Sequence, residues 1–241
     1  MTRLPLSAPL LLAAALCAIA PASALAQAKA PAAQAPAAQA PAAQAAAPTT
    51  QAPYEIKGFR SATFGMTKAQ VLAAIAADFG PSAKAQETAN PVEGTQALQV
   101  KIDKLDPGPG QATLTYIFGA STKTLSHVNV AWIVEGEATP EQRQGMITAA
   151  IQLTDYFQKL PNPPKATSGV TPTGPNGLVM YAAVDGKGAG LEVAVDGIAY
   201  QSSQARSATP SPAPKGPALL RISYYVNALN PDVYKIKPGS F

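Results

Sequence analysis

The sequence has few of the residues that enzymes use for nucleophilic, acid–base or metal chemistry. Its 241 residues include one cysteine, Cys17, and one histidine, His127. Cys17 lies in an apolar N-terminal stretch, so the rest of the chain offers no thiol, disulfide or cysteine metal ligand. A serine hydrolase or a histidine-based metal site would have to use His127, but no nucleophile elbow or His-Glu-x-x-His pattern accompanies it. We expect His127 to be a polar residue near a strand start.

Charge is also sparse. Asp, Glu, Lys and Arg make up 13% of the chain, and the formal net charge is +4. A nucleic-acid-binding protein needs a clustered basic surface, and the sequence has no such run of Lys and Arg. After the N-terminal segment, no apolar run approaches the roughly 20 residues that span a bilayer. The composition argues against nucleic acid as a partner and against a transmembrane segment in the mature chain.

The N-terminal segment has the features of an export signal. Arg3 gives a basic start, residues 10–20 form an apolar core, and Ala24-Leu25-Ala26 matches a small-x-small cleavage site. We expect a signal peptide over residues 1–26, cleaved after Ala26, and a periplasmic or secreted protein. The alternative is an uncleaved membrane anchor. Lipidation is not expected, because the residues before Cys17 do not form a lipobox.

A low-complexity segment follows over residues 27–53. The sequence Ala-Pro-Ala-Ala-Gln occurs three times in succession from Ala30. Recurrent proline prevents a continuous helix, and the segment has no large apolar side chain with which to build a core. We expect a disordered tether, acting as a spacer or as a tolerated leader, before a single domain over residues 54–241.

Two segments predict helices by the same signals. In the first, Thr67 is the expected N-cap and Gln70 completes a capping box; Gly80-Pro81 ends the helix. Its apolar stripe is Val71, Leu72, Ile75 and Phe79. The second runs over Thr139–Leu160 with Gln142 at the box position. Its stripe is Met146, Ala150, Leu153, Phe157 and Leu160, with Ile147, Ile151 and Thr154 beside it.

Apolar and polar residues alternate in the segments after each helix, which is typical of strands with one buried face. Three strands are expected after the first helix, at 98–102, 114–118 and 128–134. Three more are expected after the second, containing Leu178, Met180 and Val184; Leu191, Val193 and Val195; and Leu220, Ile222, Tyr224 and Val226. Residues 54–60 predict a short strand. Loops are expected at 83–95, 161–176 and 202–217, the last two functional or disordered.

This order predicts an α+β domain whose two helices pack on one face of an antiparallel sheet. We expect two degenerate helix–three-strand halves, at about 54–136 and 137–241. The segment Gly65–Val71, followed by Phe79-Gly80-Pro81, resembles the Gly-Met-Thr-x-x-x-Val helix start of the small lipoproteins of the outer-membrane β-barrel assembly machinery. The duplicated plan is similar to that of secreted β-lactamase inhibitor proteins. This resemblance implies a non-catalytic, protein-binding surface on a helix-covered sheet.

Other motifs favour structural roles. Gly186–Gly190 lacks the Gly-Lys-Ser/Thr ending of a phosphate-binding loop and is expected to connect two strands. Asp196-Gly197 is expected to be a turn. Glu135 and Glu137 share a face if the strand continues, a possible glycosidase pair, but solvated strand-end residues are the commoner case.

The sheet face away from the helices is the best candidate for binding. By alternation it carries Thr113, Thr115, Ile117, Ile133, Tyr181 and Tyr225. Apolar and aromatic residues on an uncovered face can mark an interaction surface. The alternative is that a loop or the tail Asn227–Phe241 covers them.

We therefore expect a non-enzymatic binding or scaffold protein that presents a sheet face to an envelope or periplasmic protein. The alternative is a carrier of a small molecule or lipid, with helices and sheet enclosing an apolar cleft. A distant third is an enzyme of unrecognised type. We assign no catalytic, cofactor-binding or metal-binding residue.

Overall fold

The computed structural model describes residues 52, 54–160, 163–168, 170–200, 214–227, 229–236 and 239. The expected signal peptide, nearly all of the tether and most of the loop expected at 202–217 lie outside these residues. The helices are α1 (Lys68–Phe79) and α2 (Pro140–Gln158). The strands are β1 (Gly58–Phe59), β2 (Ala62–Thr63), β3 (Gln86–Asn90), β4 (Thr95–Ile102), β5 (Ala112–Phe118), β6 (Leu125–Val134), β7 (Lys165–Ser168), β8 (Thr171–Gly174), β9 (Gly177–Val184), β10 (Gly190–Asp196) and β11 (Ala218–Tyr225).

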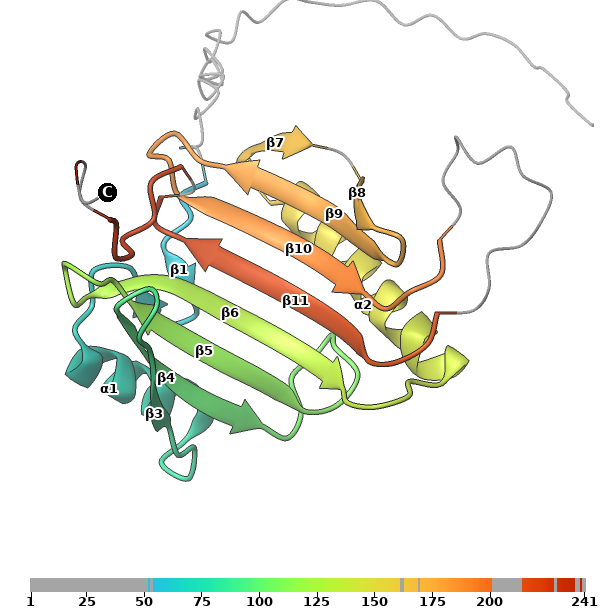
Figure 1. The fold of residues 1–241 in the computed structure, drawn as a ribbon, viewed down its shortest axis with the longest axis horizontal. Helices are drawn as coiled ribbons and strands as arrows, with labels where there is room; N and C mark the ends of the chain where they lie inside the picture. Colours follow the sequence, from blue (N-terminus) through green and yellow to red (C-terminus); the bar gives the residue numbers. More distant parts are fainter. Residues whose placement is uncertain are drawn as a thin grey trace, which may run out of the picture. The chain divides into compact units, whose positions relative to one another are not determined.

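The described strands form a large antiparallel sheet (Figure 1). Its order is β3-β4-β5-β6-β11-β10-β9-β7, and β8 pairs with β9 as well. β1 and β2 make a separate small hairpin. The predicted α+β class with an antiparallel sheet is confirmed. The central pair, β6 and β11, joins strands that lie far apart in the sequence.

The buried face of the sheet is continuous from β4 to β9. Paired residues such as Leu114 and Val130, or Trp132 and Leu220, are almost fully buried. Helix α2 packs on this face against β9, β10 and β11. Helix α1 lies on the same side of the sheet (Figure 1), and its Val71 and Ile75 are buried in the hydrophobic core. Both helices therefore cover one face, as predicted.

Both predicted helix starts are confirmed. Thr67 and Thr139 are the N-caps, and each forms a complete capping box with the glutamine three residues later. The stripe of α1 is partly wrong, because Leu72 is 42% exposed whereas Ile75 is 1% exposed. A run of adjacent apolar residues does not reveal which of them faces the sheet.

The sequence did not predict the buried contacts of Arg143 in α2. Arg143 is buried and donates hydrogen bonds from its guanidinium to the carbonyl oxygens of Gly197, Gly216 and Pro217. Glu137 pairs with the same guanidinium at 3.2 Å. These contacts join the start of α2 to the β10–β11 end of the sheet, which gives this charged residue a structural role.

The prediction for β9 is wrong at one point. Val193 pairs with Tyr181, whereas Ala194 pairs with Val179, so Met180 is the extra residue of a β-bulge. The bulge resets the alternation of side chains along the strand. Tyr181, which was expected on the open face, is consequently 2% exposed and faces α2.

Three strands lie where loops were expected. β3 falls within residues 83–95, and β7 and β8 fall within 161–176. The side chains of β3 are all exposed, so its sequence shows no period-two burial pattern. The strand forms because its backbone pairs with β4 at the edge of the sheet. The strand expected over residues 54–60 is limited to β1.

The described C-terminal residues 229–236 attach to turns at one end of the sheet. The Asp232 carboxylate accepts hydrogen bonds from the Ser121 and Thr122 amides, each at 2.9 Å, and from the Thr122 hydroxyl at 2.7 Å. The Tyr234 amide donates to the turn between β3 and β4 at 2.7 Å. Led by the Thr122 amide, these bonds lower the pKa of Asp232 to about 2.

Acid should detach this C-terminal segment. The folded pKa of Asp232, about 2, lies below its ordinary value of 3.8. The carboxylate therefore stabilises the attached state fully above its ordinary pKa, and this contribution is lost as the pH falls through about 4 towards 2. Hydrogen-exchange protection of the Ser121 and Thr122 amides should fall over that range. Asp232→Asn should show the loss already at neutral pH; unchanged protection would contradict this role.

Candidate functional site

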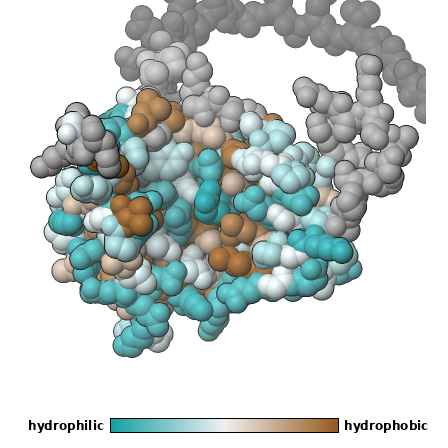
Figure 2. Space-filling view, in the orientation of Figure 1, coloured by the Kyte–Doolittle hydropathy of each residue, from teal (hydrophilic) through white to brown (hydrophobic). Residues whose placement is uncertain are grey.

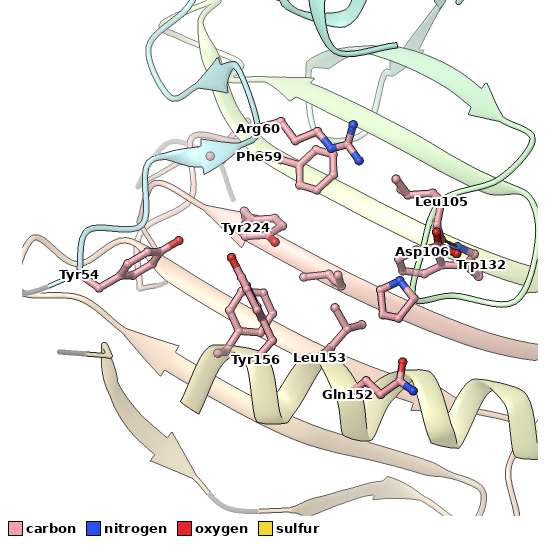
Figure 3. Close-up of a pocket in the computed structure, with 14 residues that line it drawn as sticks. Tyr54, Phe59, Arg60, Leu105, Asp106, Trp132, Gln152, Leu153, Tyr156 and Tyr224 are labelled. Carbon is pink, nitrogen blue, oxygen red and sulfur yellow. Dashed lines mark hydrogen bonds between the residues drawn. The ribbon is translucent and has the colours of Figure 1, made fainter. Parts of the chain in front are cut away.

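A cleft of about 530 Å³ opens over the centre of the buried sheet face (Figure 3). It lies between α2, the β1 segment and the loop after β4. Its base is formed by Trp132 of β6 together with Ile222 and Tyr224 of β11. The cleft therefore sits on the junction between the two central strands, where neither α1 nor α2 covers the sheet completely.

Aromatic side chains dominate the lining of this cleft. The six aromatic residues are Tyr54, Phe59, Trp132, Tyr156, Phe157 and Tyr224. Several of them pack on one another: the ring centres of Phe59 and Tyr224 are 5.8 Å apart, and those of Tyr156 and Phe157 are 5.2 Å apart. Such mutual packing holds the rings in place and leaves a preformed apolar space between them.

The loop after β4 forms one side of the cleft. The Trp132 Nε1 donates a hydrogen bond to the Leu105 carbonyl oxygen at 3.0 Å. The loop backbone then passes directly over the indole, because a Cβ atom at Gly108 would lie 2.1 Å from the Trp132 ring. Residues 106–110 form a turn, and its place beside Trp132 is a feature of tertiary structure.

Helix α2 supplies the opposite side. Leu153, Tyr156 and Phe157 recur at three- and four-residue spacing and so project from one face of the helix. Phe157 is 3% exposed and stacks on Tyr181 with ring centres 5.9 Å apart. Tyr156 is 59% exposed and stands at the opening. Phe157 is thus a buried part of the cleft wall, and its neighbour Tyr156 is an exposed ring at the opening.

Three tyrosine hydroxyls enter the cleft. Figure 3 shows those of Tyr54, Tyr156 and Tyr224 directed into the same space. Burial raises the pKa of Tyr54 and of Tyr224, so both hydroxyls remain protonated at neutral pH. The Tyr224 residue is 7% exposed, and its hydroxyl faces the cleft.

Arg60 lies at the edge of the cleft, in the turn of the β1–β2 hairpin (Figure 3). Its guanidinium carbon is 4.7 Å from the centre of the Phe79 ring and 5.6 Å from that of Phe59. Its φ is +52°, a left-handed conformation that favours glycine. Among the described residues, no carboxylate lies within ion-pair distance of it.

The residues weighed in the sequence for catalysis are not brought together. His127 lies on the sheet face opposite the helices, with its Nε2 at 3.0 Å from Asn129 Oδ1. The Ser223 hydroxyl donates to the same oxygen at 2.8 Å. Burial lowers the pKa of His127, so the ring is neutral at neutral pH. This hydrogen-bonded cluster belongs to the sheet, and its three residues do not line the cleft.

The other motifs take structural positions. β6 ends before Glu135, so Glu135 and Glu137 do not share a strand face as the glycosidase alternative requires. Glu137 instead binds Arg143 and accepts from the Gly216 amide at 2.9 Å. Gly186–Gly190 connects β9 to β10 in a hairpin, as predicted. The described part of the chain has no group of three His, Cys, Asp or Glu placed to hold a metal ion.

The face away from the helices is mixed: Figure 2 shows hydrophobic patches among polar residues. Ile133 on this face is 50% exposed, and Tyr225 packs edge-on against His127 with ring centres 5.7 Å apart. Arg221 and Glu192 form an ion pair there at 3.1 Å. The remaining predicted members, Thr113, Thr115 and Ile117, are half-buried.

Sequence reasoning did not find the cleft residues as a group, because they come from separate parts of the chain.

Comparisons with protein-family models, curated proteins and solved structures yield no match for this chain. Among the residues that the structure describes, neither helix combines the length and apolar character needed to cross a membrane.

Proposed function

We propose that this chain is an exported, non-enzymatic binding protein that holds a small, mainly apolar molecule in the cleft between α2 and the β1–β2 hairpin. The main observation in support is the cleft of about 530 Å³, which six aromatic residues line. Ligand sites commonly have this size, apolar walls and a few inward-facing polar groups. The polar groups here are the tyrosine hydroxyls, Gln152 and Arg60.

The position of the cleft agrees with a chain of two degenerate halves, about 54–136 and 137–241. Each half would contain a helix that begins with a Thr–Gln capping box, followed by antiparallel strands. The last strand of each half, β6 or β11, then pairs with the other at the centre of the sheet. The cleft lies over this junction, where a ligand contacts both halves.

The proposal of binding without catalysis is supported by how the titratable residues are used. His127 is neutral and hydrogen-bonded to Asn129. Glu137 is engaged by Arg143, and Asp185 accepts hydrogen bonds from three backbone amides. In the described lining of the cleft, the single carboxylate belongs to Asp106, whose side chain is 82% exposed.

A neutral apolar fluorophore tests the proposal. Trp132 is the only tryptophan of the chain and lines the cleft. N-phenylnaphthylamine should bind with one-to-one stoichiometry and accept excitation energy from Trp132. Tyr156→Ala should weaken this binding about tenfold, because a ring at the opening is removed.

Tyr234→Ala is the matched control. Tyr234 is 64% exposed, similar to Tyr156, but lies in the C-terminal segment away from the cleft. Its replacement should leave the affinity unchanged. Absence of energy transfer from Trp132, or equal effects of the two substitutions, would overturn the proposal.

A second candidate is a scaffold that binds an envelope or periplasmic protein through the sheet face away from the helices. The favouring observation is Ile133, which is half-exposed on a strand in the middle of the sheet. Crosslinking pull-down from intact envelopes should then recover a partner that Ile133→Asp loses without loss of fold. Retention of the same partner by the variant would count against this candidate.

A further inference from the structure

We propose that the ligand of this cleft is an amphipathic anion, with an oxyanion group bound at Arg60 and an apolar body held between the aromatic rings. The inference rests on the proposed function and deepens it. It concerns the chemistry that Arg60 and Tyr224 add to an otherwise apolar space.

Arg60 is the cation that the surrounding structure leaves available. Lys57 and Lys187 are also near this end of the chain, but the ammonium groups of both form ion pairs with the Glu55 carboxylate. The nitrogen–oxygen distances are 3.4 Å for Lys57 and 2.9 Å for Lys187. Arg60 rests on the Phe79 ring, and its one hydrogen bond to another described residue is a 3.5 Å contact with the Asp78 carbonyl oxygen. A guanidinium stacked on a ring keeps its in-plane N–H groups free to bind an oxyanion with two hydrogen bonds.

The backbone at Arg60 supports this assignment. The hairpin turn holds residue 60 at φ +52°, where glycine would be free of strain. The turn is held by Ser61, whose amide and hydroxyl donate to the Asp78 carboxylate at 3.1 Å and 2.6 Å. The strained position therefore carries a long cationic side chain to the edge of the cleft. Such strain often accompanies a functional position.

Tyr224 provides a second polar contact in the cleft. Its hydroxyl is directed into the cleft, beside those of Tyr54 and Tyr156. A ligand oxygen at this point could accept a hydrogen bond from it. Phe59 packs against Tyr224 and also lies beneath Arg60, which places the two donors on either side of one ring.

An anion bound here would meet two carboxylates. The Asp78 carboxylate lies beside Arg60 and accepts hydrogen bonds from the Ser61 amide and hydroxyl. Asp106 supplies the single carboxylate of the described lining, but its side chain is 82% exposed and lies 3.9 Å from the Lys104 ammonium. An exposed, partly neutralised carboxylate acts weakly across solvent. The cleft thus has a cationic edge, an aromatic interior and hydroxyl donors, which together match an amphipathic anion.

The test compares two probes that share one ring system. Anilinonaphthalene sulfonate is N-phenylnaphthylamine with an added sulfonate. With the full chain, the sulfonate probe should bind about tenfold tighter than the neutral one, and high salt should reduce the difference. Arg60→Gln should abolish the preference and leave the neutral probe unaffected. Arg60→Lys should retain part of the preference for the sulfonate probe. Tyr224→Phe should weaken binding of the sulfonate probe and leave binding of the neutral probe unchanged.

Lys57→Gln is the control for general charge, because it removes a neighbouring cation that is already paired. It should leave both affinities unchanged. Circular dichroism and melting curves should match wild type for each variant, since the sulfonate probe also binds partly unfolded chains. Equal affinities of the two probes, or equal effects of Arg60→Gln and Lys57→Gln, would overturn the ligand class alone. Failure of the neutral probe to bind would overturn the proposed function, and the ligand class with it.

Discussion

Phe157→Ala is expected to lower the free energy of unfolding by about 3–5 kcal/mol, the range for removing a buried phenylalanine. Phe157 is 3% exposed and joins α2 to the sheet, stacking on Tyr181 and meeting Tyr224 edge-on with ring centres 6.4 Å apart. Its truncation leaves a cavity between layers that cannot close without moving the helix. Urea or guanidinium denaturation, followed by Trp132 fluorescence, measures the loss.

The adjacent residue gives a matched control. Tyr156→Ala removes a ring of similar size that is 59% exposed, so we expect a change in stability below about 1 kcal/mol. The same substitution should weaken binding of the neutral probe. The pair therefore compares a buried ring of α2 with an exposed ring at the opening of the cleft. Equal destabilisation by both substitutions would show that the packing of α2 differs from the structure described.

Ile75→Ala should cost about 2–5 kcal/mol. Ile75 is 1% exposed and belongs, with Val71, to the hydrophobic core beneath α1. If α1 packs on the sheet as described, this loss should far exceed that of a substitution at the surface of the helix. Denaturant melts provide the comparison, and an Ile75→Ala variant as stable as wild type would contradict the packing of α1.

Two other positions on the same helix set the scale. Leu72→Ala has similar chemistry but begins from a side chain that is 42% exposed, so we expect a loss below about 1 kcal/mol. Thr67→Ala removes an N-cap, for which about 1 kcal/mol is typical. The loss in the free energy of unfolding should be largest for Ile75→Ala and smaller for Leu72→Ala and Thr67→Ala. A larger effect at Leu72 than at Ile75 would require α1 to be rotated about its axis.

Helix starts and most strands were predictable because their signals are local. A capping box needs only four consecutive residues, and both Thr67 and Thr139 meet that condition in the sequence and in the structure. Period-two alternation likewise identified the buried face of β4, β5, β6, β10 and β11. β3 was missed because an exposed edge strand has no buried side to produce a pattern.

The candidate site could not be predicted in the same way. Arg60, Trp132, Tyr156 and Tyr224 come from separate parts of the chain, and no spacing rule relates them. The pairing of β6 with β11 brings Trp132 and Tyr224 to one junction, and α2 then places Tyr156 above it.

The amino-acid sequence by itself determined where the helices begin, which class of fold the chain adopts and which faces of most strands are apolar, because these depend on near neighbours and on short periods. Only the tertiary structure decided strand order, the bulge at Met180 that turns Tyr181 inward, and the aromatic cleft with Arg60 at its edge. These features depend on long-range backbone pairing and on the space left between packed layers, which no local pattern encodes.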